Sequence, residues 1–154
     1  MGKVVESVVI EAPLAEVWDF YFQAETWPSW VDQFGRVESS EGYPEVGGTL
    51  TWGSTAAGRG RVSERVLEHE PRTRHKVAFE DPESEGELAV TFSIEPGEGT
   101  GSTKVEQEME YKVSGGGALS GIADVLFVRS QQRKSLLRSL GRLRVEILDA
   151  VRAG

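Results

Sequence analysis

The fold is decided near the N-terminus, where residues 3–30 read KVVESVVIEAPLAEVWDFYFQAETWPSW. Apolar side chains dominate Lys3–Ile10 as they do in a β-strand. Pro13 then interrupts the run, and because proline is favoured in the first turn of a helix, we expect a helix at about residues 13–22. A second proline between two tryptophans predicts another short helix at about residues 26–31. One strand followed by a compact helix pair is therefore expected.

The rest of the sequence alternates strand-like segments with turns and ends in a long helix. Apolar and polar residues alternate in these segments, and glycine, proline or charged residues separate them, which favours an antiparallel meander. We expect strands at Gly35–Ser40, Thr49–Thr55, Arg61–Glu70, Arg74–Glu80, Leu88–Glu95 and Lys104–Val113. About thirty C-terminal residues carry an apolar stripe at helical spacing. This order predicts an α+β fold in which a curved antiparallel sheet wraps around the terminal helix and leaves space between the two layers.

Length and composition narrow the class of protein. The 154 residues, 38% of them hydrophobic, suit one domain spanning residues 1–154. The absence of cysteine excludes disulfides and thiolate chemistry, and it fits a cytoplasmic location. A net charge of −8 repels phosphate, so we expect no binding to nucleic acid. No segment approaches the roughly twenty apolar residues that cross a bilayer, so we expect no membrane insertion.

Strand alternation assigns the side chains that face the space between sheet and helix. Successive side chains of a strand point to opposite faces, and the charged set of each strand must face water. The opposite set, with residues near the start of the terminal helix, forms the predicted lining: Trp52, Val62, Glu64, Val77, Phe79, Val90, Phe92, Gln107, Met109, Tyr111, Ile122, Leu126 and Arg129. Because aromatic walls suit flat apolar ligands, this set predicts binding of a small apolar or aromatic molecule.

Two polar residues, Glu64 and Gln107, fall on the apolar face. An unpaired buried carboxylate costs several kcal/mol, so Glu64 must be paired, protonated or hydrated. Either a bulge or an arginine partner explains it structurally, or it is a ligand-binding group or general acid–base with a pKa raised by burial. For Gln107 the alternatives are a structural hydrogen bond and contact with the ligand. These two are our candidate catalytic residues, should the protein be an enzyme.

The terminal helix and the histidines carry weaker signals. Residues 129–135, RSQQRKS, interrupt the apolar stripe. They lie beyond the sheet edge or at a helix break, or else Arg129 or Arg133 overlooks the cavity and pairs with Glu64 or an anionic ligand group. His69 and His75 lack a third ligand at suitable spacing, so we expect surface or strand-end histidines and no metal site.

Four segments share their pattern with a known family. They are Val8–Trp18 (VVIEAPLAEVW), Trp27–Trp30 (WPSW), Val46–Thr49 (VGGT) and Val66–Pro71 (VLEHEP). Together with the long terminal helix, they resemble the polyketide cyclase/dehydrase-like group of the START-like, or helix-grip, superfamily over nearly the whole chain. The resemblance implies a seven-stranded antiparallel sheet that grips the C-terminal helix, with an interior cavity for lipids, polyketides, plant hormones or similar ligands.

The resemblance leaves the activity open, because its members include carriers, aromatase/cyclases, polyketide-processing enzymes and chaperone ATPase activators. One alternative to ligand binding or transport is a cyclase or dehydrase, a lyase or isomerase in which Glu64 and Gln107 shuttle protons. The other is a protein-interaction module that uses the helix face with Arg138 and Arg142. Oxygenases of the superfamily need an iron–sulfur domain and a two-histidine, one-carboxylate site that this chain lacks, so we expect no cofactor.

Overall fold

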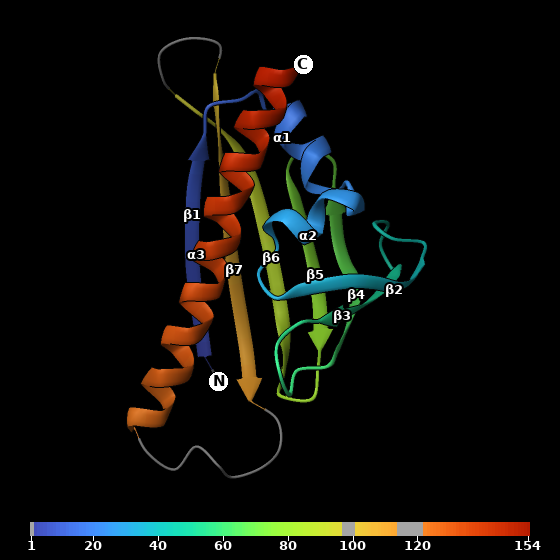
Figure 1. Cartoon of the computed structure of the whole chain (residues 1–154), viewed down its shortest axis with the longest axis vertical. Coiled ribbons are helices and arrows are strands. Elements are labelled where there is room, and N and C mark those ends of the chain that lie inside the picture. The colour runs from blue at the N-terminus through green and yellow to red at the C-terminus, as the bar shows by residue number, and fades with distance from the viewer. Residues whose placement is uncertain (1, 97–100, 114–121) are drawn as a thin grey trace.

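The computed structural model describes residues 2–96, 101–113 and 122–154 (Figure 1). Within them, the strands are β1 (Gly2–Ile10), β2 (Phe34–Glu41), β3 (Thr49–Ser54), β4 (Arg61–Glu70), β5 (Arg74–Glu80), β6 (Ser84–Glu95) and β7 (Ser102–Val113). The helices are α1 (Leu14–Tyr21), α2 (Trp27–Trp30) and α3 (Ile122–Ala153), and a 3-10 turn, Ala24–Thr26, leads into α2. The predicted order of elements is confirmed.

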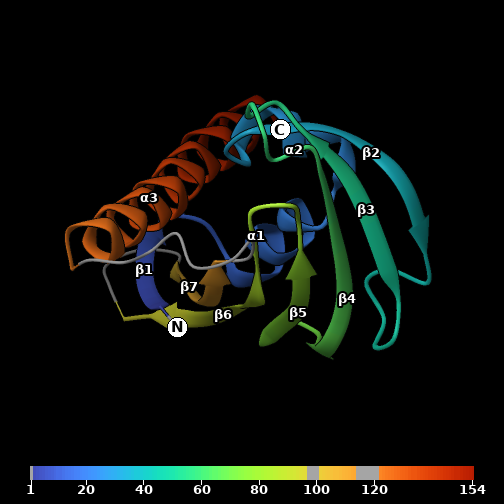
Figure 2. The same cartoon turned by 90° about the horizontal axis from the view of Figure 1, so that it is seen from below.

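The seven strands form one antiparallel sheet in the order β1-β7-β6-β5-β4-β3-β2. Figure 2 shows this sheet bending from β1, beneath α3, round to β2, with α2 on the same side of the sheet as α3. Helix α3 packs against β1 and α2 rather than along the middle strands. The curved sheet around a terminal helix, a helix-grip fold, is therefore confirmed.

Helix α3 is continuous, and among its described side chains, from Val125 onward, the first buried one is Leu136. The buried side chains of this stripe are Leu136, Leu140, Leu143 and Ile147. Leu126, which we expected to line the cavity, is 57% exposed, and its neighbour Val125 is 50% exposed. That expectation is wrong because the first turns of α3 extend past the end of β1 (Figure 1). The polar interruption at residues 129–135 thus precedes the packed half of one unbroken helix.

Strand β6 begins at Ser84 rather than at the predicted Leu88, because its first residues pair with the end of β7. Gly86 lies in this added segment, opposite Tyr111 of β7 and Phe79 of β5. A Cβ atom at Gly86 would overlap the carbonyl oxygen of Glu110. A glycine in a strand interior commonly marks such a close backbone approach, and here only glycine fits.

Alanine substitutions at two glycines test this packing. Gly86→Ala forces β6 away from β7, so we expect the free energy of unfolding in urea to fall by about 2 kcal/mol or more. The control is Gly141→Ala in α3, where nothing lies within 4 Å of an added Cβ. This change should raise the free energy of unfolding by about 0.5–1 kcal/mol, because alanine loses less backbone entropy in a helix. Equal stability of the two variants would contradict the described strand pairing.

Candidate functional site

A cavity of about 130 Å³ lies between the concave face of the sheet and the helices. Its sheet wall comprises Leu50, Trp52, Glu64, His75, Val77, Leu88, Val90, Gln107 and Met109. The opposite wall comprises Tyr21, Trp27, Trp30, Val31, Asp32, Phe34, Tyr43, Arg59, Ser135, Leu136 and Ser139. An apolar cavity of roughly 150 Å³ accommodates benzene, so this one has the size of a molecule with a single aromatic ring.

The structure places part of the predicted lining in this wall. Trp52, Glu64, Val77, Val90, Gln107 and Met109 line the cavity. Four others are buried in the core outside the lining: Val62, Phe79, Phe92 and Tyr111. Phe92, for example, stacks edge-on against Trp18 and Tyr21 of α1, which fill the space beside the cavity. Leu126 and Arg129 are exposed outside the lining, since the start of α3 extends past the sheet, and the side chain of Ile122 lies outside the described residues.

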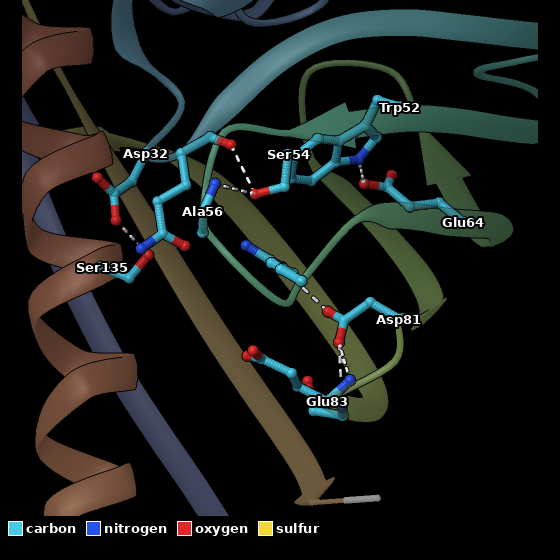
Figure 3. A network of polar contacts seen from close by, with 11 residues as sticks. Asp32, Trp52, Ser54, Ala56, Glu64, Asp81, Glu83 and Ser135 are labelled. Carbon is cyan, nitrogen blue, oxygen red and sulfur yellow. Dashed lines mark hydrogen bonds and ion pairs between the residues drawn. The ribbon is translucent and has the colours of Figure 1, made fainter.

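Glu64 faces the cavity in a regular stretch of β4, between Leu50 of β3 and Phe79 of β5. The Trp52 indole Nε1 donates a hydrogen bond of 2.8 Å to Glu64 Oε2 (Figure 3). Removal from water raises the pKa of the Glu64 carboxyl, against the opposing effects of the Trp52 hydrogen bond and the Arg59 charge. No bulge turns Glu64 outward, because the bulge of β4 comes after Val66. Glu64 thus offers the cavity a carboxyl group that can accept or donate a proton.

Arg59, in the loop between β3 and β4, is held above the Trp52 ring. Its guanidinium carbon lies 5.2 Å from the ring centroid, and its Nε lies 2.9 Å from Asp81 Oδ2. Asp81 Oδ1 in turn accepts hydrogen bonds from the backbone N–H groups of Glu83 and Ser84 (Figure 3). These contacts fix a cation beside the indole that holds Glu64, because stacking on the ring and pairing with Asp81 restrain the same side chain.

Gln107 is 4% exposed and uses only one end of its amide. Its Nε2 donates a 3.0 Å hydrogen bond to the Tyr21 hydroxyl, while Oε1 is buried with no hydrogen-bond partner among the described residues. Burial raises the pKa of the Tyr21 hydroxyl, which therefore stays protonated. A buried acceptor left unpaired costs about 1–3 kcal/mol, so a ligand that donates to it gains affinity. Gln107 thus makes a structural hydrogen bond through Nε2 and also offers a ligand the acceptor Oε1.

His75 lies near the start of β5, so of our two alternatives it is a strand-end and not a surface histidine, and its side chain is part of the cavity wall. It is 4% exposed, because it shares a strand face with Val77 and the two short helices cover that face. A hydrogen bond of 3.3 Å joins His75 Nε2 to the Tyr43 hydroxyl, and one of 3.0 Å joins His75 Nδ1 to His69 Nδ1. Burial, followed by the nearby His69, lowers the pKa of His75 to about 4. His75 is consequently a neutral hydrogen-bonding group.

Asp32, directly after α2, connects the short helices to α3. Its Oδ2 accepts a 2.8 Å hydrogen bond from the Ser135 hydroxyl (Figure 3), and its backbone N–H donates a 2.8 Å bond to the Ser139 hydroxyl. Arg138 and Arg142 lie 3.3 Å and 3.5 Å from Asp32 Oδ1. The sequence pattern did not single out Asp32, because its role depends on how α3 docks. We call these five residues the Asp32 cluster.

Arg133 is not a cavity residue. Its Nε lies 2.9 Å from Glu6 Oε1 on β1, so it helps to fix α3 to the sheet edge. Neither Arg129 nor Arg133 lines the cavity, so the alternative in which one of them overlooks it and pairs with Glu64 is wrong. Among residues 2–96, 101–113 and 122–154, no group of three or more His, Cys, Asp or Glu could hold a metal ion, and no helix is long and apolar enough to cross a membrane.

A sequence match over most of the chain defines the class of protein. Residues 1–147 match the family described as "Polyketide cyclase / dehydrase and lipid transport", and the chain belongs to this family. The resemblance inferred from the sequence is thereby confirmed. None of the curated proteins is similar enough in sequence to match.

Solved structures share the fold at low sequence identity. An aromatase/cyclase, Zhui from Streptomyces sp. R1128, is 15% identical at a TM-score of 0.75, over 99% of this chain and 96% of its own. A START superfamily protein from Mycobacterium smegmatis is 14% identical at a TM-score of 0.71, over 96% and 98%. Norcoclaurine synthase from Thalictrum flavum, in complex with dopamine and hydroxybenzaldehyde, is 15% identical at a TM-score of 0.67, over 96% and 87%. At these identities the likeness concerns the fold.

The lowered pKa of His75 predicts a specific dependence of stability on pH. Unfolding exposes His75, whose pKa then rises from about 4 towards 6.5, so the unfolded chain binds more protons between these values. The stability contributed by neutral His75 is present above about pH 6.5 and is lost as the pH falls towards 4. The loss is on the order of 3 kcal/mol.

Urea unfolding of the wild type and of His75→Asn across this pH range measures the effect. The variant should be less stable at neutral pH, because its side chain packs less well, and its stability should change less as the pH falls. Two curves that run parallel would contradict the assignment of His75 as a buried neutral histidine.

Proposed function

We propose that the protein binds a small, largely apolar or aromatic molecule in the cavity between the sheet and the helices. The observation that carries the proposal is an aromatic-walled cavity that contains a buried acceptor without a protein partner, Gln107 Oε1. Apolar walls with a few convergent polar groups are typical of small-molecule sites. The family description names lipid transport as well as polyketide chemistry, so carriage of the ligand is compatible with the family.

The cavity volume favours a ligand with one aromatic ring in this conformation. Rings of Trp27, Trp30 and Trp52 line it, and their edges and faces suit aromatic contacts. Norcoclaurine synthase, which shares the fold, is recorded with the small aromatic molecules dopamine and hydroxybenzaldehyde, and this supports the same size class. Acetophenone, a neutral ketone with one ring, is therefore a suitable probe.

Filling the cavity tests the proposal. Val77 is 3% exposed in the cavity wall, so Val77→Phe places a ring in the space that the ligand needs. We expect saturable quenching of tryptophan emission by acetophenone in the wild type, and at least about a tenfold loss of affinity in this variant. The matched control is Val145→Phe on the exposed side of α3, which should bind as the wild type does. Binding that is unchanged by Val77→Phe would contradict the site, and thermal melts of both variants establish that they are folded.

A second candidate function is acid–base catalysis of the dehydratase kind. The specific observation in its favour is Glu64, a carboxyl group with a raised pKa in the cavity wall, held at one oxygen by Trp52. In its ionised form such a group can accept the α-proton of a β-hydroxy ketone, and it can then return this proton to the β-hydroxyl, which leaves as water while the C=C bond forms. Zhui, which shares the fold, is an aromatase/cyclase, in agreement with this second candidate.

A β-hydroxy ketone with a phenyl ring, 4-hydroxy-4-phenylbutan-2-one, tests the catalytic candidate, because its loss of water forms a conjugated enone with strong ultraviolet absorption. We expect slow dehydration by the wild type, and loss of this activity in Glu64→Gln with binding of the ketone retained within a few fold. A wild-type rate equal to the buffer rate, or an undiminished rate in Glu64→Gln, would count against catalysis by Glu64.

Fewer observations support the other alternative, a protein-interaction module. It needs the arginine face of α3, yet Arg138 and Arg142 are both within ion-pair distance of Asp32. We also propose a cytoplasmic location, which suits a chain without cysteine.

A further inference from the structure

A chain of hydrogen bonds leads from the cavity to the end of β4. It starts at the Tyr43 hydroxyl, passes through both nitrogens of His75, and ends at Nδ1 of His69, with distances of 3.3 Å and 3.0 Å. Tyr43 and His75 line the cavity, whereas His69 is partly exposed near the end of β4. The histidines are direct cross-strand partners on β4 and β5. The chain thus connects the partly exposed imidazole of His69 to the hydroxyl group of Tyr43 in the cavity.

Aromatic rings hold the two imidazoles in place. Trp18 of α1 and Phe22, the residue directly after α1, lie with ring centroids 5.2 Å and 5.4 Å from that of His69. Phe22 also lies 4.9 Å from His75, edge-on, and the Tyr43 ring lies 5.5 Å from His75. Rings packed in this way restrict the turning of each imidazole. The nitrogen atoms that face one another therefore stay paired, and only the positions of the protons can change.

The direction of the chain decides what Tyr43 offers to a ligand. A neutral imidazole has one N–H donor and one acceptor nitrogen. If His69 donates to His75 Nδ1, then His75 carries its proton on Nε2 and donates to the Tyr43 oxygen, so the Tyr43 hydrogen is free for the ligand. In the reverse direction Tyr43 donates to His75, and only its oxygen lone pair remains for the ligand. A charged His69 has protons on both nitrogens and permits only the first direction.

We propose that His69, acting through His75, orients the Tyr43 hydroxyl as a hydrogen-bond donor to a carbonyl oxygen of the ligand. Ketone or aldehyde ligands consequently bind more tightly when His69 is charged. The inference rests on the proposed function and adds to it the ligand's chemical class and its link to pH. Tyr43 is the residue that contacts the ligand, and His75 and His69 are positioning residues.

The charged and titratable neighbours do not break this chain. Burial raises the pKa of Tyr43 well above its ordinary value, with further increases from Glu64 and Tyr21, so the hydroxyl keeps its proton. From α1 and the residue after it, the contacts of the histidines are the rings of Trp18 and Phe22. On β4 and β5, Glu68 pairs with Arg74 at 2.8 Å beside His69.

The remaining chain neighbour of His69 is Glu70, at the end of β4. Because the pKa of His75 is lowered to about 4, His75 stays neutral and can relay the direction of the hydrogen bonds. Two carboxyl groups, Asp32 and Glu64, also line the cavity; Asp32 is paired with Arg138 and Arg142, and the contribution of Glu64 is measured separately.

Two probes separate this proposal from the proposed function. Acetophenone carries a carbonyl oxygen, and isopropylbenzene has nearly the same shape with a methyl group in its place. We expect acetophenone to bind about three- to tenfold more tightly at pH 5 to 5.5 than at about pH 8, the gain expected from one added hydrogen bond. Isopropylbenzene should bind with nearly the same affinity at both pH values. If neither probe binds, both proposals are overturned; if both bind without a pH difference between them, only the present one is.

Variants test whether the hydrogen-bond chain of Tyr43, His75 and His69 causes the pH dependence of binding. Tyr43→Phe should remove the preference for acetophenone at every pH, whereas Tyr111→Phe, a buried tyrosine outside the cavity lining, should leave it intact. His69→Gln should keep binding and abolish its pH dependence, and Glu64→Gln should retain that dependence. A pH dependence that survives in His69→Gln, or a carbonyl preference that survives in Tyr43→Phe, would overturn the proposal.

A measurement on the wild type needs no substitution. The ¹⁵N resonances of labelled histidine distinguish Nδ1–H from Nε2–H tautomers. Acetophenone should shift His75 towards the Nε2–H form, because its carbonyl oxygen favours the direction in which His75 donates to Tyr43 and Tyr43 donates to the ligand. A purely structural histidine pair would show no such change, and an unaltered His75 tautomer on saturation with acetophenone would contradict the inference.

Discussion

The contact on which the cavity depends is the Asp32 cluster, in which one buried carboxylate and its backbone N–H bind the hydroxyls of Ser135 and Ser139. This cluster fixes α3 to the end of α2, and the pairing of Arg133 with Glu6 fixes it to β1. Helix α3 is thus held at the side of the sheet rather than over its middle. The rings of α1 and α2 occupy much of the space in between, and the part that they leave open is the cavity.

The walls of this cavity hold more polar groups than packing alone would favour. Glu64, His75 and the free end of Gln107 are all removed from bulk water, and each would cost less stability if it were an apolar residue. Sequences commonly depart from favourable packing at functional sites. Because these groups lie on three different strands of one concave face, they are arranged around a common space in which a polar group of the ligand can meet them.

Strand alternation predicted which face of the sheet each side chain takes, because parity along a strand decides it, but it did not predict which members of that face border the cavity. Val77, Val90 and Met109 were placed correctly on that basis, and His75 shares the parity of Val77, so the same rule could have found it. The helix wall was not predictable in this way, since the positions of Trp27, Trp30 and Asp32 depend on how separate elements dock. Leu126 and Arg129 were misplaced because a helical stripe indicates which side of α3 is apolar, but does not indicate where the sheet ends.

The central claim is that the layers enclose a space that a small apolar molecule can occupy. The chain has two methionines, Met1 and Met109, and Met109 lies in the cavity wall. Labelling the methionine methyl groups with ¹³C therefore gives a spectrum in which the cavity has its own resonance. Titration with acetophenone should shift the Met109 signal saturably and produce nuclear Overhauser contacts from this methyl to the ligand ring. A Met109 resonance that neither shifts nor shows such contacts at high acetophenone concentration would contradict the account.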